Sequence, residues 1–343
     1  MKKITVFLCW FLLMFFFTAC GYSDRGDAGR GRTVIDDLGH EVRLPGKIDR
    51  IATNYGIAAH MVIALGAGHR LVALDTYSRD NSFYHEVVPA IKELPQAGLP
   101  FDADPEIILK SRPDIVLTMG RMGDGGLRLS RYGITAYAVK AETIESLPES
   151  MLRLGSVLGC GEKASRFSRY YNDKIKMIRR RLKGIAEKER PLVYLTGPMG
   201  LFSTCSGEMM QHHIIELCGG RNAGGALRGM GSGHGWTSVS MELVIAWNPG
   251  VILIIKLSPV RVKEVTAQPE LAGVDAVKHK RVYEYPSRLY PWDYPSPQTI
   301  LGMLWLAKKL HPRLFDDINV QREADDFFTV FYGKSFSAMG GSL

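Results

Sequence analysis

Along most of the chain, apolar residues are arranged in two patterns that alternate. Short apolar runs typical of buried strands alternate with segments in which apolar residues recur at helical spacing. The predicted strands are residues 51–54, 71–75, 115–119, 134–139, 192–196, 201–204 and 251–255. The predicted helices are residues 56–65, 104–111, 127–132, 209–217, 241–247, 300–310 and 322–331. Strands that alternate with helices indicate a parallel, doubly wound α/β sheet.

A long helical stretch interrupts this alternation near the middle of the chain. Residues 142–158 and 163–188 form it almost without a break, and the α/β alternation restarts afterwards. A small hairpin is predicted over residues 34–44, ahead of the first strand of the alternation. The pattern therefore predicts two Rossmann-like α/β lobes bridged by a long rigid helix. The expected divisions are an N-terminal lobe at 33–158, a linking helix at 159–190 and a C-terminal lobe at 191–343.

The N-terminus determines the expected compartment. Lys2 and Lys3 precede an almost wholly apolar run, residues 4–17, which is too short to cross a bilayer comfortably. Residues 1–19 are therefore predicted to be a secretory signal, and the polar, glycine-rich residues 20–32 a flexible tether. The placement of Cys20 resembles a bacterial lipobox, which implies cleavage before Cys20, lipid on its thiol and an exported, membrane-anchored protein. A plain signal peptide with an incidental cysteine, or an uncleaved anchor, are the alternatives.

Charge and cysteine content narrow the function classes. Removing residues 1–19 takes away two lysines and no acid, so the formal charge falls from +8 to +6. That modest excess favours anionic ligands or surfaces, but no compact basic and aromatic stretch indicates nucleic-acid binding. Cys160, Cys205 and Cys218 would remain, which allows at most one internal disulfide, with Cys205 and Cys218 as one option. No GxSxG, HExxH or P-loop motif is present, and no enzymatic activity is expected.

Two short blocks, residues 104–117 and 240–253, share one plan. Each has a capping residue, an acid two positions later, one or two helical turns, a proline and then an apolar strand. Their order and spacing resemble the class III periplasmic binding proteins of iron-siderophore and vitamin B12 importers. Residues 34–45, 202–222 and 236–242 also fit, and the resemblance covers roughly residues 34–331.

The resemblance implies a ligand cleft between the lobes and a permease partner driven by a cytoplasmic ATPase. In that family one exposed glutamate on each lobe docks onto permease arginines, and Glu106 and Glu242 match those positions. Two separated carboxylates on a rigid body would fix the register on a basic partner. The alternative is that each acid, in the first turn of its helix, only interacts with the helix dipole.

Ligand contacts are expected in loops at strand ends that face the other lobe. Aromatic rings there offer flat apolar area to a bulky chelate, and arginines can bind carboxylate, hydroxamate or phosphate oxygens. The candidate ligand-binding residues are Tyr55, Arg79, Arg121, Trp236, Arg288, Tyr290 and Trp292. Arg288 and Trp292 stand out because residues 290–294 concentrate three aromatics in a loop that no core is expected to need. For each ring, ordinary packing is the alternative.

Direct metal ligation is a weaker hypothesis, and no metal site is predicted. His212 and His213 are adjacent on a predicted helix, so their side chains point about 100° apart and cannot easily serve one ion. His234, next to Trp236 in a glycine-rich loop, is the better candidate ligand. Haem coordination by His234 or Tyr55 stays open, whereas a set of ligands for bare zinc or manganese cannot be assembled.

The sequence thus predicts a substrate-binding lipoprotein of an ABC importer that carries a metal chelate such as a ferric siderophore or a corrinoid, without an intrinsic cofactor. Haem and an oxyanion, molybdate or tungstate, are alternative ligands for the same fold. A metal-dependent reductase would need cysteines near the cleft for a cluster, and the three available lie in or near packed segments. A surface adhesin or sensor lipoprotein is a further alternative.

Overall fold

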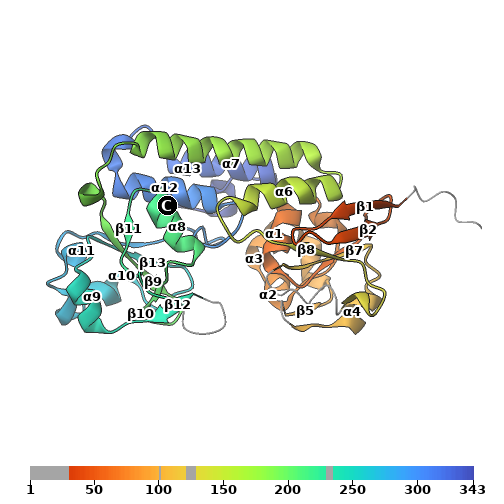
Figure 1. The fold of residues 1–343 in the computed structure, drawn as a ribbon, viewed down its shortest axis with the longest axis horizontal. Helices are drawn as coiled ribbons and strands as arrows, with labels where there is room; N and C mark the ends of the chain where they lie inside the picture. Colours follow the sequence, from red (N-terminus) through yellow and green to blue (C-terminus); the bar gives the residue numbers. More distant parts are fainter. Residues whose placement is uncertain (1–30, 100–101, 121–128, 229–234) are drawn as a thin grey trace, which may run out of the picture.

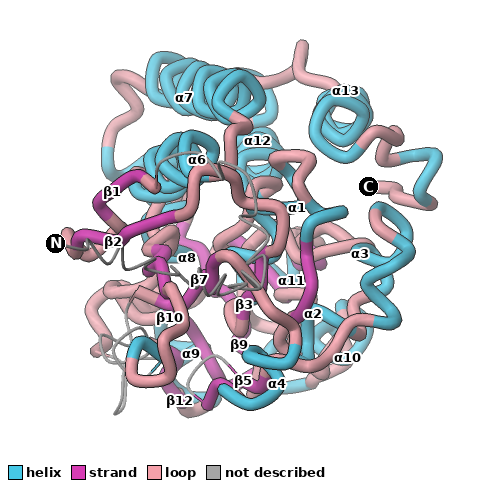
Figure 2. Tube along the Cα trace, turned by 90° about the vertical axis from the view of Figure 1, so that its right-hand side faces the viewer, coloured by secondary structure: helices cyan, strands magenta, loops and turns pink. Residues whose placement is uncertain are grey.

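The structure, a computed structural model, describes residues 31–99, 102–120, 129–228 and 235–343. Two α/β lobes lie side by side, and a layer of helices runs along one side of both (Figure 1). The end-on view shows the same helices above the strands (Figure 2). This arrangement confirms the predicted fold class. No helix in the described part of the chain is both long and apolar enough to cross a membrane.

The N-terminal lobe is built on a parallel sheet. Its strands are β3 (Ile51–Thr53), β4 (Leu71–Ala73), β7 (Ile115–Met119) and β8 (Ala136–Val139). Among the described residues they pair in the order β4-β3-β7-β8, all parallel, and almost every position in them is buried. Strands buried on both faces read as continuous apolar runs, which is why the sequence pattern identified them. The lobe's helices are α1 (Gly56–Ala64), α2 (Thr76–Arg79), α3 (Ser82–Val87) and α4 (Pro105–Lys110).

Two small antiparallel pairs complete this lobe. The predicted hairpin is present as β1 (Arg32–Ile35) and β2 (Glu41–Leu44). Its turn contains Gly39 at φ 87°, a left-handed conformation that glycine adopts without steric cost. The second pair is β5 (Gly98–Leu99) with β6 (Asp102–Ala103).

The C-terminal lobe has a mixed sheet. Its strands are β9 (Leu192–Gly197), β10 (Gly200–Cys205), β11 (Arg221–Asn222), β12 (Trp236–Ser238), β13 (Val251–Ile254) and β14 (Val282–Glu284). The order in the described residues is β12-β10-β9-β13-β14, with β11 on β9; β10 runs antiparallel to both of its neighbours. Its helices are α8 (Met210–Leu217), α9 (Met241–Trp247), α10 (Val262–Thr266) and α11 (Asp275–Lys278). Cys160, Cys205 and Cys218 are free thiols, so the Cys205–Cys218 disulfide is not formed in this structure.

The helical layer consists of α6 (Ser146–Val157), α7 (Gly161–Leu182), α12 (Thr299–Leu310) and α13 (Val320–Tyr332). Short 3-10 turns lie at Gly68–Arg70, Pro89–Glu93, Glu187–Glu189, Pro269–Leu271, Pro312–Leu314 and Ser337–Met339. Helix α7 buries Phe167, Tyr171 and Ile178, as their helical spacing predicts. It ends at Leu182, earlier than predicted from sequence, because Lys183 is extended and Gly184 has φ 96°.

The lobes meet in a buried aromatic junction, to which helix α13 of this layer contributes. We call it the inter-lobe aromatic cluster; it comprises His60, Phe83, Tyr84, Tyr290, Phe328 and Tyr332. The Tyr84 and Tyr290 rings stack with centroids 5.9 Å apart, and His60 Nε2 lies 2.9 Å from Tyr332 Oη. The segment predicted as the C-terminal lobe therefore also supplies α13, which contacts α1 in the other lobe.

Candidate functional site

The expected ligand loops follow strand ends and come from both lobes. Helices α2 and α3, which follow β4, lie on the side of the N-terminal lobe that faces the other lobe (Figure 1). Helix α8 and strand β12 lie on the facing side of the C-terminal lobe (Figure 1). The fold thus brings together segments that are far apart in sequence, at the place where open α/β sheets bind ligands.

Tyr55 is part of the framework of these loops. It directly precedes α1 and is only 2% exposed, so its ring belongs to the core. Its hydroxyl donates to Glu142 Oε1 at 2.9 Å, and its backbone N–H donates to Thr53 Oγ1 at 3.0 Å. Tyr55 therefore connects the segment after β3 with the segment after β8, while its ring presents almost no surface to a ligand in this structure.

The three candidate arginines differ in what the structure says of them. The Nε of Arg79 donates to the carbonyl oxygen of Lys92 at 3.2 Å, which holds its half-buried side chain against its own lobe. Arg288 is exposed and lines a cavity of about 520 Å³ together with Lys256 and Lys309. Arg121 lies outside the described residues, as do His234 and Cys20.

The expectation that no core needs the loop at 290–294 is wrong. Trp292 is 0% exposed, and its ring packs 5.3 Å from that of Phe336. Tyr290 is 8% exposed and belongs to the inter-lobe aromatic cluster. Both rings fill space between the C-terminal lobe and its neighbours, so neither offers a face to a ligand in this structure. Of the three aromatics in this loop, Tyr294 is the exposed one, at 37%.

Trp236 keeps part of its surface accessible. It lies on β12, opposite Cys205 of β10, and is partly buried. The ring passes close to Gly197, where a Cβ atom would stand 2.8 Å from its Cε3. Gly197 therefore makes room for the indole.

Exposed apolar side chains at strand ends are further candidate ligand contacts that were not selected from the sequence. Tyr77 is 73% exposed, Met199 62% and Leu257 60%, and these residues follow β4, β9 and β13 respectively. Tyr294, in the segment after β14, belongs to the same group. Tyr77 and Tyr294 lie in loops that the sequence pattern identified, so their type and position could have selected them. Met199 and Leu257 became visible only through their exposure.

Two buried carboxylates lie in these segments. Asp75 Oδ1 accepts from the backbone N–H of Ser78 at 2.9 Å and caps α2, while burial raises its pKa. Burial raises the pKa of Asp293 to about 7, and its backbone carbonyl accepts from Gln211 Nε2 at 3.1 Å. A carboxyl group that holds its proton near neutral pH can donate a hydrogen bond, which an ionised one cannot.

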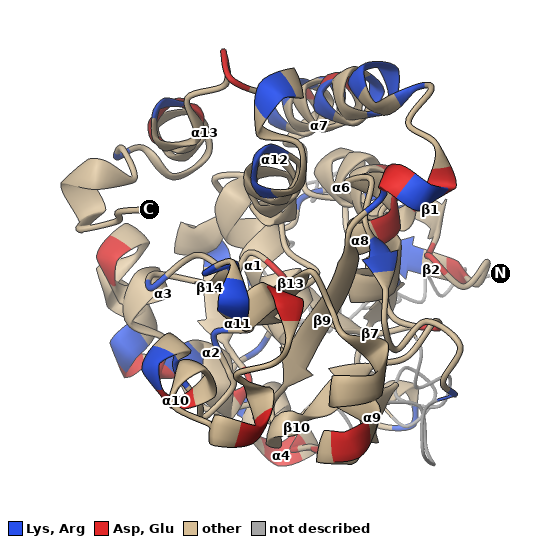
Figure 3. Cartoon of the chain, turned by 90° about the vertical axis from the view of Figure 1, so that its left-hand side faces the viewer, with Lys and Arg blue, Asp and Glu red and all other residues tan. Residues whose placement is uncertain are grey.

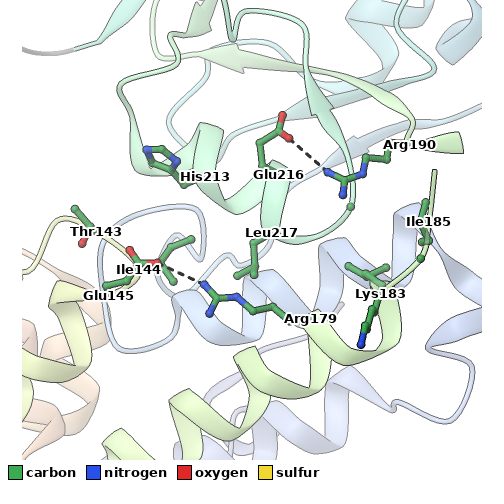
Figure 4. A pocket seen from close by; sticks show the side chains of 13 residues that line it. Thr143, Ile144, Glu145, Arg179, Lys183, Ile185, Arg190, His213, Glu216 and Leu217 are labelled. Carbon is green, nitrogen blue, oxygen red and sulfur yellow. Dashed lines mark ion pairs between the residues drawn. The ribbon is translucent and has the colours of Figure 1, made fainter. Parts of the chain in front are cut away.

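A different cavity, of about 680 Å³, lies between the lobes. It is enclosed by residues 143–145, by the end of α7 and by α8, and His213 lies at its edge (Figure 4). Arg179 faces Glu145 at 3.6 Å and Arg190 faces Glu216 at 3.8 Å, so its charges pair across it (Figure 4). No predicted ligand residue lines this cavity. Within the described ranges no three His, Cys, Asp or Glu side chains are grouped to hold a metal ion.

Glu106 and Glu242 lie on the surface opposite helix α7. Both α4 and α9 are at that side, one in each lobe, and carry acidic residues there (Figures 1 and 3). Glu106 is exposed and pairs with Lys110 at 3.0 Å. Glu242 is exposed as well, and hydrogen bonds from its own backbone N–H and from the Ser240 side chain lower its pKa. The lowered pKa keeps Glu242 ionised at neutral pH, and both carboxylates are accessible.

Comparison with known sequences decides the family. The sequence model of a family described as periplasmic binding protein matches residues 51–289. The chain belongs to the class III substrate-binding proteins of ABC transporters. The molybdate-binding protein MolA of Haemophilus influenzae is 23% identical over 332 residues, covering 89% of this chain and 92% of MolA. An uncharacterized ABC transporter substrate-binding lipoprotein of Bacillus subtilis, YvrC, is 22% identical, covering 83% and 87% of the two chains.

Other periplasmic binding proteins extend the range of ligands. The vitamin B12-binding protein of Pectobacterium carotovorum is 27% identical, covering 67% of this chain and 78% of that protein. Among solved structures, a periplasmic solute binding protein from Veillonella parvula has a TM-score of 0.80, with 23% identity and coverage of 89% and 94%. MolA bound to molybdate has a TM-score of 0.77, with 22% identity and coverage of 89% and 98%. This periplasmic binding protein therefore shares its fold with relatives whose named ligands differ.

Proposed function

We propose that this binding protein captures a metal chelate, such as a ferric siderophore or a corrinoid, and delivers it to an ABC permease. The observation that carries the proposal is the group of large exposed side chains at strand ends: Tyr77, Met199, Leu257 and Tyr294. Large apolar side chains left exposed at strand ends are candidate ligand contacts, and flat rings suit a bulky chelate. Trp236, Arg79, Arg121 and Arg288 complete the proposed contact set, with Tyr55 as a positioning residue.

A binding experiment tests this assignment. The purified protein is titrated with a ferric hydroxamate, cyanocobalamin, haem and molybdate while tryptophan fluorescence and heat are recorded. Ligand carried through purification is identified by mass spectrometry and by its visible spectrum. Tyr77→Ala and Trp236→Ala should each weaken chelate binding by about 1–3 kcal/mol, the cost of losing a buried aromatic contact.

The matched control is Tyr132→Ala. Tyr132 is also strongly exposed, at 56%, but it precedes β8 and lies at the opposite end of that strand from the ligand loops. The Tyr132→Ala variant should bind ligand like the wild type. Wild-type affinity in both the Tyr77 and Trp236 variants would show that the ligand does not bind at these strand ends.

An oxyanion is the second candidate ligand. It is favoured by exposed Arg288, which shares its cavity with Lys256 and Lys309, and by similarity to MolA along 89% of this chain. A tetrahedral oxyanion would be held by charged hydrogen-bond donors instead of aromatic surface. Calorimetric binding of molybdate or tungstate, with no binding of ferric chelates or corrinoids, would favour this candidate over the chelate.

Glu106 and Glu242 are proposed to dock the loaded protein onto the permease. Their exposure and their position on one side of both lobes support this role, as does the lowered pKa of Glu242. Glu106→Arg combined with Glu242→Arg should abolish uptake while ligand affinity stays normal, because neither residue belongs to the contact set. Normal uptake would remove the docking role, and loss of ligand affinity would place these acids near the ligand.

Lipid anchoring at Cys20 is proposed from the lipobox-like order of residues 17–20, and the relative YvrC is named as a lipoprotein. Cys20→Ser should release the protein from membranes without altering ligand affinity. Unchanged membrane fractionation of this variant would reject the anchor.

A further inference from the structure

The two helices that carry the proposed docking acids match position by position. Each has a capping residue, Asp104 or Ser240, whose side chain accepts hydrogen bonds from the first turn. The glutamate follows two residues later, and a fully buried aliphatic residue follows two residues after that. The helices α4 and α9 are thus fixed to their lobes in the same way, with the same residue positions turned outward.

An exposed aliphatic side chain stands at the same place in both helices. Leu109 is 45% exposed and Ile245 is 41% exposed, and each lies three residues after its glutamate. Residues three apart on a helix are about 60° apart around the axis and one turn along it, so they form neighbours on one surface. Each lobe therefore presents a carboxylate beside an unburied branched side chain.

The two pairs differ in one neighbour. Lys110 occupies the position after Leu109, and its Nζ lies 3.0 Å from Glu106 Oε1. In α9 the corresponding position is Ala246, so that helix places no cation beside Glu242 there. The N-terminal carboxylate must exchange an intramolecular partner for an external one, whereas the C-terminal carboxylate is free of that competition.

We propose that each lobe docks through a carboxylate and aliphatic pair, Glu106 with Leu109 and Glu242 with Ile245. This inference rests on the proposed docking function. The proposed partner surface is that of the two-fold permease, with a basic side chain next to an apolar recess in each of its halves. The apolar contact excludes water from the rim of the ion pair, which strengthens the charge attraction and gives the contact a shape requirement. Lys110 weakens the N-terminal contact, so the C-terminal lobe is the stronger of the two.

Binding of the full-length protein to its permease–ATPase complex in nanodiscs tests the proposal. Leu109→Ala combined with Ile245→Ala should weaken binding about tenfold or more, as expected for losing two partly buried aliphatic contacts. The matched control is Leu152→Ala with Leu314→Ala, which removes side chains of similar exposure, 39% and 41%, from outside α4 and α9. Ligand affinity, measured in parallel, should be unchanged in all of these variants.

Charge substitutions test the asymmetry. Lys110→Ala should strengthen binding about twofold, the scale of an exposed ion pair, and Ala246→Lys should weaken it by a similar factor. If Glu106→Arg with Glu242→Arg abolishes binding while the Leu109 and Ile245 variants bind like the wild type, the paired contact is wrong and docking by the acids stands. If the glutamate variants also bind normally, the docking function itself is wrong.

Discussion

Loss of the Tyr332 hydroxyl should destabilise the protein, because this group joins the two lobes in a buried site. Its Oη lies 2.9 Å from His60 Nε2 in α1 and donates to Gln298 Oε1 at 2.9 Å. Tyr332 is 7% exposed, and His60 and Gln298 are fully buried. Tyr332→Phe removes both hydrogen bonds and keeps the ring, which packs 5.1 Å from Phe83.

The magnitude follows from what the substitution leaves behind. His60 Nδ1 and Gln298 Nε2 already lack a partner within the described residues, so the two groups have no second hydrogen bond to fall back on. Each buried polar group left unpaired costs about 1–3 kcal/mol, and two such groups give a loss of about 2–6 kcal/mol. At about 2 °C per kcal/mol for a chain of this size, the melting temperature should fall by about 4–12 °C.

Urea unfolding and differential scanning fluorimetry measure this loss. Tyr132→Phe is the matched control, because it removes a hydroxyl from a side chain that is exposed to water and leaves no buried group unpaired. This variant should change stability by less than about 0.5 kcal/mol. Tyr332→Phe with a melting temperature within about 1 °C of the wild type would show that the inter-lobe hydrogen bonds contribute nothing net.

Three further predictions concern the same buried region. Burial raises the pKa of Asp293 to about 7, so between about pH 4 and 7 the folded chain keeps a proton that the unfolded chain has lost. The stability that this group contributes therefore falls as pH rises across that window, by about 1.4 kcal/mol per pH unit. Asp293→Asn should remove this fall in a series of denaturation measurements from pH 5 to 8. Burial lowers the pKa of His60 to about 3, so only the unfolded chain binds a proton on this group between about pH 6.5 and 3, and the stability from His60 falls on acidification. His60→Gln should flatten the acid side of the plot of stability against pH. An unchanged slope would contradict the burial of His60 in its neutral form. Gly302→Ala would place a Cβ 2.6 Å from the carbonyl oxygen of Trp292 and should lower stability by about 1–3 kcal/mol in urea, whereas Gly161→Ala, with nothing within 4 Å, should be tolerated.

Local pattern was sufficient for most of the secondary structure. The buried parallel strands read as apolar runs, and α7 reads as an amphipathic helix, because each element's burial repeats with its own period. The paired blocks around Glu106 and Glu242 were equally readable, since a cap, a first-turn acid and a buried position lie within a few consecutive residues.

Contacts between distant residues decided the rest. The sequence placed Tyr290 and Trp292 in a surface loop, yet the partners that bury them are Tyr84 and Phe336, on other elements. Likewise His60 and Tyr332 are 272 residues apart and meet only because α13 packs against α1. An aromatic side chain has the same local pattern whether it faces a core or a ligand, so its role depends on which surfaces the fold brings against it. The sequence by itself determined the two-lobed α/β architecture and the outward-facing acids, whereas only tertiary packing decided which rings remain exposed to bind.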